Sequence, residues 1–250
     1  MLQDLHSHTY YSFCGKDNPE DIIKNAISAG LDVFGISDHN YGVGYGRYVL
    51  WIASEGYSDG DYGYNIDKYF DHISLLKEKY KDKIEIKRGI EVSVFQNSLP
   101  YVLPEGADIS KFDYCMIEHI DYPPEQNAAD RDLFAFAKRC GTPFVGVAHT
   151  DMFAFIKSLG KDALEYFSKM AENNIFWEMN VNYDKVHYYR EHQYIKEFFS
   201  NPEQQEIIRK SGVRLSVGFD GHWKEDYAPD RIINACKKIS QMGIKLQFEE

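Results

Sequence analysis

Histidines and carboxylates stand at the ends of short apolar runs along most of the chain. Each is among the last residues of a predicted strand or directly follows one: His6, His8, His39, Glu91, His119, His149, Asp220 and His222. Because the carboxyl ends of parallel strands lie on one face of a barrel, we expect these side chains to converge on one rim. Imidazoles and carboxylates are ligands for zinc, iron and manganese. The pattern therefore predicts a metal centre.

The spacing within this set supports the same prediction. His6 and His8 are two residues apart, as are Asp220 and His222, and side chains two apart in an extended segment point the same way. A single histidine after a strand is weak evidence, because it is more often a hydrogen-bonded surface residue. A single catalytic zinc uses about three protein ligands, so this many candidates indicate more than one ion. Other histidines fall in predicted helices and are expected at the surface or in helix packing: His72, His187 and His192.

The elements that must position these residues alternate regularly. Apolar runs predict strands at 2–6, 31–37, 84–92, 112–120, 143–149, 175–181 and 213–219. Amphipathic segments predict helices at 19–30, 67–80, 128–140, 161–173, 186–200, 202–211 and 228–242. Strands followed by helices indicate a parallel sheet with helical crossovers, and the strand count favours a closed or nearly closed α/β barrel. Without linker composition or repeats, we expect one domain over residues 1–250.

Residues 41–66 interrupt this alternation, because they are rich in tyrosine and glycine and show no clear period. Loops of this length are usually functional, so we interpret the segment as an irregular lid or substrate loop. Its aromatic side chains could enclose a small ring of a substrate or form a packed lid without substrate contact: Tyr45, Tyr48, Trp51, Tyr57, Tyr62 and Tyr64.

The composition limits which classes of substrate and partner we expect for this protein. The formal net charge is −11, which disfavours long nucleic acids but allows a small phosphorylated substrate near bound cations. The sequence has neither an apolar run long enough to span a membrane nor a signal-peptide pattern, so we expect a cytoplasmic protein. The spacing of the four cysteines matches neither a zinc knuckle nor a disulfide framework, and we expect reduced, mostly buried thiols: Cys14, Cys115, Cys140 and Cys236.

The ordered set of motifs resembles the PHP (polymerase and histidinol phosphatase) superfamily. The similarity runs from DLHSHTYYS and NPEDIIKNAISAGLDVFGISDHN through KIEIKRGIEVSVF, CMIEHID and FVGVAHTD to FWEMN and LSVGFDGH. Each piece alone is unspecific, but the ordered set is specific. The chain length, the FCG tripeptide and the tyrosine-rich insertion are similar to those of histidinol-phosphate phosphatases.

The resemblance implies a distorted (β/α)₇ barrel that holds two or three divalent ions, zinc, iron or manganese. One ion would be held by His6, His8, Glu91 and Asp220. A second would share Glu91 as a bridge and add His119 and His149. A third would use His39, His222 and a residue of the loop after the first strand. Many relatives carry a histidine just after the Cys-Gly pair, where this chain has Lys16 and Asp17, so Asp17 is the candidate there.

The expected reaction is hydrolysis of a small phosphomonoester, most simply L-histidinol phosphate to L-histidinol and phosphate in histidine biosynthesis. Divalent ions at such a site activate water and neutralise phosphate oxygens. Glu91 would fix the ion spacing, Asp220 would orient the nucleophile, and His222 is one candidate for the general acid. Lys185 and Arg190 either clamp the phosphate or are ordinary surface charges.

Two rival functions remain open from the sequence. A PHP protein could cleave a nucleotide or another small phosphate monoester or diester. A PHP domain could also bind metal without catalysis, although such domains normally lose ligands. Neither the physiological metal nor the oligomeric state follows from the sequence.

Overall fold

The computed structural model of the protein describes residues 1–52 and 61–250. Its strands are β1 Gln3–Asp4, β2 Val33–Ile36, β3 Glu85–Arg88, β4 Glu91–Ser93, β5 Cys115–Glu118, β6 Val145–Val147, β7 Ile175–Asn180 and β8 Leu215–Gly218. Its helices are α1 Pro19–Ser28, α2 Asn40–Tyr45, α3 Val49–Ile52, α4 Tyr62–Tyr80, α5 Leu133–Cys140, α6 Met152–Ser158, α7 Ala163–Glu172, α8 Gln193–Ser200, α9 Pro202–Ser211 and α10 Pro229–Gln241. Short 3₁₀ turns cover Pro124–Gln126 and Lys224–Asp226.

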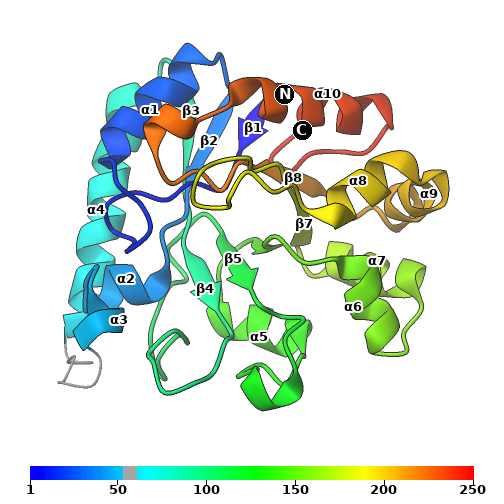
Figure 1. Ribbon diagram of the computed structural model, residues 1–250, viewed down its shortest axis with the longest axis horizontal. Helices are drawn as coiled ribbons and strands as arrows, with labels where there is room; N and C mark the ends of the chain where they lie inside the picture. Colours follow the sequence, from blue (N-terminus) through cyan, green and yellow to red (C-terminus); the bar gives the residue numbers. More distant parts are fainter. Residues whose placement is uncertain (53–60) are drawn as a thin grey trace.

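The strands are all parallel and follow one another in sequence order. They form the sheets β1-β2-β3 and β4-β5-β6-β7-β8. A parallel bridge between His39 and Glu91 joins the two sheets on one side, and a bridge between Ser7 and Gly221 joins β1 to β8 on the other. The predicted α/β fold of parallel strands connected by helices is therefore confirmed, and the two bridges join its sheets in the manner of a distorted barrel (Figure 1).

One predicted strand, 84–92, is broken into β3 and β4. The break falls at Gly89 and Ile90, between the two sheets. A Cβ on Gly89 would overlap the ring of Tyr114, which lies inside the barrel and donates a hydrogen bond from its hydroxyl to the carbonyl of Leu5 (2.6 Å). Only glycine allows this close approach, so the strand bends around Tyr114.

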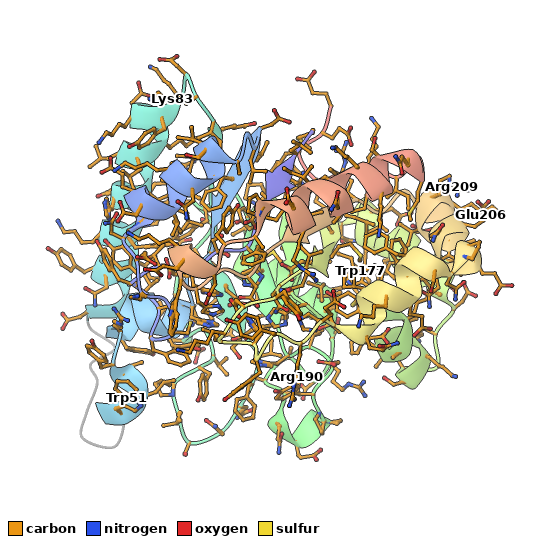
Figure 2. All side chains as sticks on the ribbon, turned by 45° about the horizontal axis from the view of Figure 1, so that its top comes forward. Trp51, Lys83, Trp177, Arg190, Glu206 and Arg209 are labelled. Carbon is orange, nitrogen blue, oxygen red and sulfur yellow. The ribbon has the colours of Figure 1, made fainter. Side chains whose placement is uncertain are left out.

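Alternate side chains of the strands divide the core into two layers. Tyr114 and Met116 belong to a small cluster inside the barrel, whereas Cys115 and Ile117 belong to the larger layer under the helices. Trp177 of β7 is buried in this outer layer against α7 and α8 (Figure 2). The inner cluster fills the barrel near the beginnings of the strands, which leaves their carboxyl ends to polar side chains.

Several segments differ from the sequence expectation. Residues 41–66 are not irregular throughout, because α2, α3 and the first turn of α4 lie within them, while residues 53–60, including Tyr57, lie outside the described residues. Helix α6 was not predicted. The predicted helix 186–200 begins only at Gln193, because Tyr188 and Tyr189 have φ of 53° and 54°, a left-handed backbone that a helix cannot continue. Among the described residues, no helix combines the length and apolar character needed to cross a membrane.

A partly buried ion network joins the end of β3 to the residues just before β5. This network should make the free energy of unfolding depend on pH. Asp113 accepts hydrogen bonds from Arg88 Nη2 (2.6 Å) and Lys77 Nζ (3.1 Å), and despite burial these partners lower its pKa to about 2. Since a free aspartate has a pKa of about 3.9, this stabilisation is complete above pH 4 and is lost as pH falls through 2.

We therefore expect Asp113→Asn to lower the free energy of unfolding by about 2 kcal/mol at pH 7. Urea unfolding of the chelator-treated protein at pH 7 and at pH 3 measures the effect. The difference between wild type and variant should shrink at the lower pH, and an equal difference at both values would contradict this account.

Candidate metal centre

Seven of the residues predicted at the rim meet at the carboxyl ends of the strands. Six of them line one pocket together with Glu118, His187 and His192: His8, His39, Glu91, His149, Asp220 and His222. His6 lies directly beneath, fully buried, with Nε2 3.2 Å from Nε2 of His8. His119 lies at the edge, its ring centroid 6.4 Å from that of His149. The structure thus brings together residues separated by more than two hundred positions.

Glu91, the first residue of β4, is at the centre of the cluster. Its Oε1 lies 3.2 Å from His6 Nε2 and 3.1 Å from His149 Nε2. Its Oε2 lies 2.9 Å from His39 Nδ1 and 3.4 Å from His8 Nε2. Each carboxylate oxygen therefore faces a different pair of imidazoles, which is the arrangement that a bridging ligand between two cations requires.

Asp220, just after β8, forms the second carboxylate of the cluster. Its Oδ1 lies 3.1 Å from His8 Nε2 and 3.6 Å from His6 Nε2. Its Oδ2 lies 3.2 Å from His187 Nε2 and accepts a hydrogen bond from Asn180 Nδ2 (3.3 Å). One oxygen thus faces the first-strand histidines and the other is held by two polar side chains.

Further carboxylates and hydroxyls orient the imidazoles from behind. His6 Nδ1 donates to Glu178 Oε1 (2.8 Å), which turns Nε2 towards Glu91. Ser93 Oγ holds His119 Nδ1 (2.9 Å). A carboxylate behind a histidine of this kind fixes the ring and raises its basicity as a ligand. Glu178 lies within an apolar strand, a sequence signal that was overlooked.

The backbone is strained where three rim residues leave their strands. His119, His149 and Asp220 have φ of 68°, 48° and 54° although none is glycine. Such left-handed residues cost of order 1–3 kcal/mol each and concentrate at functional sites. The surrounding packing maintains this strain and thereby aims the side chains into the pocket.

The charges of the cluster are strongly coupled. Burial opposes ionisation of Glu91, yet His6 and His39 keep its pKa well below the usual range. Burial also opposes protonation of His6, but Glu178 and Glu91 hold its pKa well above the usual range. In contrast, burial and the neighbouring His39 lower the pKa of His8 to about 3. Glu91 is thus ionised at neutral pH and surrounded by imidazoles.

The nitrogen and oxygen atoms of the cluster are suited to binding divalent cations. Among the described residues, Asp184 Oδ2 and His222 Nδ1 are buried without a hydrogen-bond partner, and His39 Nδ1 and Glu91 Oε2 lie 2.9 Å apart without forming a hydrogen bond. Leaving one such atom unpaired costs about 1–3 kcal/mol. Potential ligand atoms of His6, His8 and Glu91 lie within 4.8 Å of one another, as do those of His8, Asp220 and His222. Imidazole and carboxylate donors at this density suit zinc, iron or manganese.

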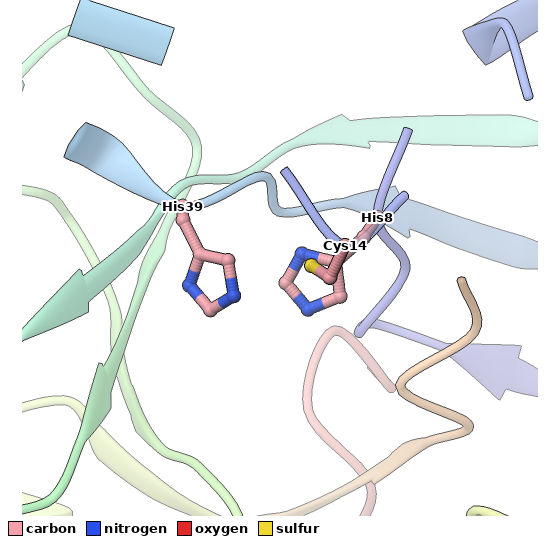
Figure 3. Close-up of side chains that lie close together, drawn as sticks. All are labelled: His8, Cys14 and His39. Carbon is pink, nitrogen blue, oxygen red and sulfur yellow. The ribbon is translucent and has the colours of Figure 1, made fainter. Parts of the chain in front are cut away.

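The loop after β1 differs from its prediction. Asp17 Oδ2 accepts a hydrogen bond from the backbone N–H of Lys224 (2.8 Å), so this carboxylate is engaged in anchoring the turn before α10. Cys14, rather than Asp17, is grouped with His8 and His39 (Figure 3). Sequence spacing favoured the acidic residue, but the tight fold of the loop directs the thiol to the histidines.

His187 and His192 are not the surface or packing residues that were predicted. His187 lies in the loop before α8, where Nδ1 is 2.7 Å from Asp184 Oδ1 and Nε2 is 3.2 Å from Asp220 Oδ2. These carboxylates raise its pKa to about 9 against the effect of burial. The ring of His192 stacks on that of His149, with centroids 6.3 Å apart. The prediction failed because the segment was assigned to a helix. His72, in contrast, lies in α4 as predicted, 3.0 Å from the Tyr11 hydroxyl.

Lys185 and Arg190 are on the same loop as His187, and both are exposed. Lys185 lies over the ring of Trp223, 5.2 Å from its centroid, and Arg190 over that of Tyr188 (Figure 2). Their role in phosphate binding stays a prediction.

Of the aromatic residues predicted in the lid, Tyr62 is buried against α2, whereas Tyr48, Trp51 and Tyr64 are largely exposed. Tyr41 instead stacks on His39, with centroids 4.9 Å apart.

The family assignment follows from the sequence as a whole. The family model described as PHP domain matches residues 4–244, from the end of β1 to just beyond α10. The chain belongs to the PHP domain family. All seven rim residues that converge lie inside the matched part of this PHP domain.

Two curated relatives are similar to parts of this PHP domain. The histidinol-phosphatase of Lactococcus lactis subsp. lactis (strain IL1403) is 28% identical over 92 residues, which are 36% of this chain and 29% of that protein. A Thermotoga maritima protein named probable histidinol-phosphatase is 29% identical over 157 residues, 59% of this chain and 54% of that protein. The matched segments thus span about half or less of the relatives' own lengths.

A solved PHP-type structure supports the fold. The histidinol phosphate phosphatase from Lactococcus lactis subsp. lactis Il1403, complexed with zinc, L-histidinol and phosphate, superposes with a TM-score of 0.56 at 16% identity. The superposition covers 98% of this chain and 95% of that chain. At this identity the likeness establishes a common architecture.

Gly218, the last residue of β8, lies directly against His6 and Glu178 of the metal centre. A Cβ at this position would overlap Glu178 Oε1 and lie 2.6 Å from His6 Cβ. We expect Gly218→Ala to displace this hydrogen-bonded pair, to lower the free energy of unfolding by about 2 kcal/mol and to reduce the content of bound divalent metal. Thermal unfolding and elemental analysis measure both effects.

Gly63→Ala in α4 is the matched control, because a Cβ there meets nothing within 4 Å. It should leave metal content unchanged. If Gly218→Ala also retained full stability and metal content, the close packing described for His6 and Glu178 would be wrong.

Proposed function

We propose that this PHP domain is a divalent-metal-dependent phosphatase of small phosphomonoesters. The observation that carries the proposal is the position of Glu91, whose two oxygens face separate pairs of histidines. A carboxylate shared in this way holds two cations at short range, the arrangement used for in-line displacement at phosphorus.

The proposed ligands form overlapping sets around Glu91. Oε1 of Glu91 lies beside His6 and His149, with His119 next to His149, and Oε2 lies beside His8 and His39. Asp220 Oδ1 lies 3.6 Å from His6 Nε2 and 3.1 Å from His8 Nε2. His39 and His222 stack on opposite sides of His8, with ring centroids 4.5 and 4.6 Å away. When bound, divalent ions lower the pKa of water and neutralise phosphate oxygens.

The chain's own residues supply orientation and proton transfer. Asp220 keeps one oxygen towards the pocket because Asn180 and His187 hold the other. Despite its burial, His222 has a pKa raised to about 10 by Cys14 and Asp184, and His187 is likewise paired with a carboxylate. Because His222 is among the proposed metal ligands and His187 is not, we propose that His187 protonates the leaving alcohol.

L-histidinol phosphate is the proposed substrate. Support comes from the names of the two partial relatives and from the histidinol-phosphate phosphatase with the same architecture. The exposed cations Lys185 and Arg190 beside His187 are proposed to bind the phosphate as it enters. The acidic net charge of −11 disfavours long nucleic acids as substrates.

A substrate panel on the zinc- or manganese-reconstituted full chain tests the proposal. We expect phosphate release from histidinol phosphate with a higher kcat/KM than from nucleoside monophosphates, and no cleavage of bis(p-nitrophenyl) phosphate. A preference for nucleotides or the diester would redirect the assignment to another PHP activity. Stable metal binding with no hydrolysis of any substrate would indicate a non-catalytic domain.

A further inference from the structure

Cys14 reaches the metal centre from the loop between β1 and α1. Its sulfur lies within 4.8 Å of a ring nitrogen of His8 and of His39 (Figure 3). The ring of His222 stacks on that of His8, with centroids 4.6 Å apart, so it lies beside the same group of side chains. Cys14 is only half-buried, unlike the other cysteines of the chain, which are buried away from solvent: Cys115, Cys140 and Cys236.

The loop holds Cys14 in place from both ends. Asp38 accepts hydrogen bonds from the backbone N–H and the hydroxyl of Thr9, both at 2.7 Å. At the other end, the backbone N–H of Lys16 donates to the carbonyl of His222 (3.1 Å). A side chain positioned by a rigid loop loses little conformational entropy when it binds a ligand.

The two histidines around the thiol have spare ligand atoms. The side chain of His222 is 5% exposed, and its Nδ1 has no hydrogen-bond partner. Nδ1 of His39 lies 2.9 Å from Glu91 Oε2 without forming a hydrogen bond. These buried imidazole nitrogens are an observation independent of the cysteine, and they can serve as ligands for a cation.

We propose that Cys14, His39 and His222 form a sulfur-containing cation site that favours zinc over manganese. Cys14 would bind as the thiolate, with its proton released to solvent. Thiolate is a soft ligand that suits zinc, whereas manganese prefers oxygen donors. This site would lie beside the pair of cations bridged by Glu91. The inference rests on the metal-binding part of the proposed function and does not depend on phosphate hydrolysis.

Cobalt is the probe, because a cobalt–thiolate bond gives a near-ultraviolet charge-transfer band. The band should be present in the cobalt-reconstituted full chain and absent in Cys14→Ser. Zinc content should fall by about one ion per chain in this variant, whereas manganese content should not change. Cys236→Ser is the matched control, since the Cys236 thiol exchanges hydrogen bonds with the backbone of Gln3, away from the metal centre, and the band should persist.

X-ray absorption of the zinc-loaded wild type tests the site without any variant. A sulfur scatterer at about 2.3 Å from zinc is expected. Zinc surrounded only by nitrogen and oxygen, or a cobalt band that survives in Cys14→Ser, would overturn the sulfur site while leaving the rest of the metal centre standing. A chain that binds no cation at all would overturn both proposals.

Discussion

Replacing Glu91 with glutamine is expected to reduce phosphate release by at least about 1,000-fold while the chain remains folded. Glutamine keeps the shape of the side chain but removes the charge that two pairs of imidazoles surround. A loss of several kcal/mol of charge stabilisation corresponds to about this factor. Steady-state kinetics with histidinol phosphate, together with elemental analysis, measures the effect, and bound metal should fall as well.

Glu85→Gln is the matched control, because Glu85 is an exposed residue of β3 that pairs with Lys87. It should keep wild-type activity and metal content. Circular dichroism of both variants separates loss of function from loss of fold. A folded Glu91→Gln protein with undiminished turnover would rule out the bridging role.

Replacing His187 with alanine should lower kcat/KM for the phosphomonoester by at least about 100-fold, because the change removes both the proposed general acid and a residue that orients a metal ligand. The imidazole joins Asp184 Oδ1 at 2.7 Å to Asp220 Oδ2 at 3.2 Å. Without it, Asp220 loses a partner and one buried carboxylate oxygen is released. We expect the fall in kcat to be accompanied by weaker metal retention during dialysis.

His72→Ala is the comparison that isolates this effect. His72 contacts the Tyr11 hydroxyl from α4 and is not part of the pocket lining. Its replacement should leave kcat, KM and metal content near the wild-type values. If the two alanine variants behaved alike, His187 would belong to the surface, as its sequence position first suggested.

The order of the elements and the convergence of most rim residues could be predicted because both follow from repeating rules. Apolar runs alternate with amphipathic segments, and parallel strands place their carboxyl ends on one face. Glu91 and Asp220 stand at such ends in the predicted strands, so their meeting could be expected without knowledge of packing, although the break in strand 84–92 makes Glu91 the first residue of β4. The predicted helix 202–211 even has the observed bounds, since Asn201 caps it and Gly212 ends it.

The functional residues that the sequence did not predict are positioned by the conformation of a loop, or they contact a ligand side chain from the side away from the pocket. His187 approaches Asp220 because the backbone at Tyr188 and Tyr189 turns left-handed, and no local pattern in the sequence encodes that turn. The roles of Cys14 and Asp17 depend on how one loop folds back between β1 and α1. Glu178 left a weaker signal, a carboxylate in an apolar strand, which indicates a buried partner.

The most direct test of the central claim measures phosphate release from histidinol phosphate before chelation, after chelation and after return of zinc or manganese. The account predicts that activity disappears with the bound ions and returns when they are restored, because Glu91 and the surrounding histidines act through cations. Full activity in a protein verified by elemental analysis to be free of metal would contradict it.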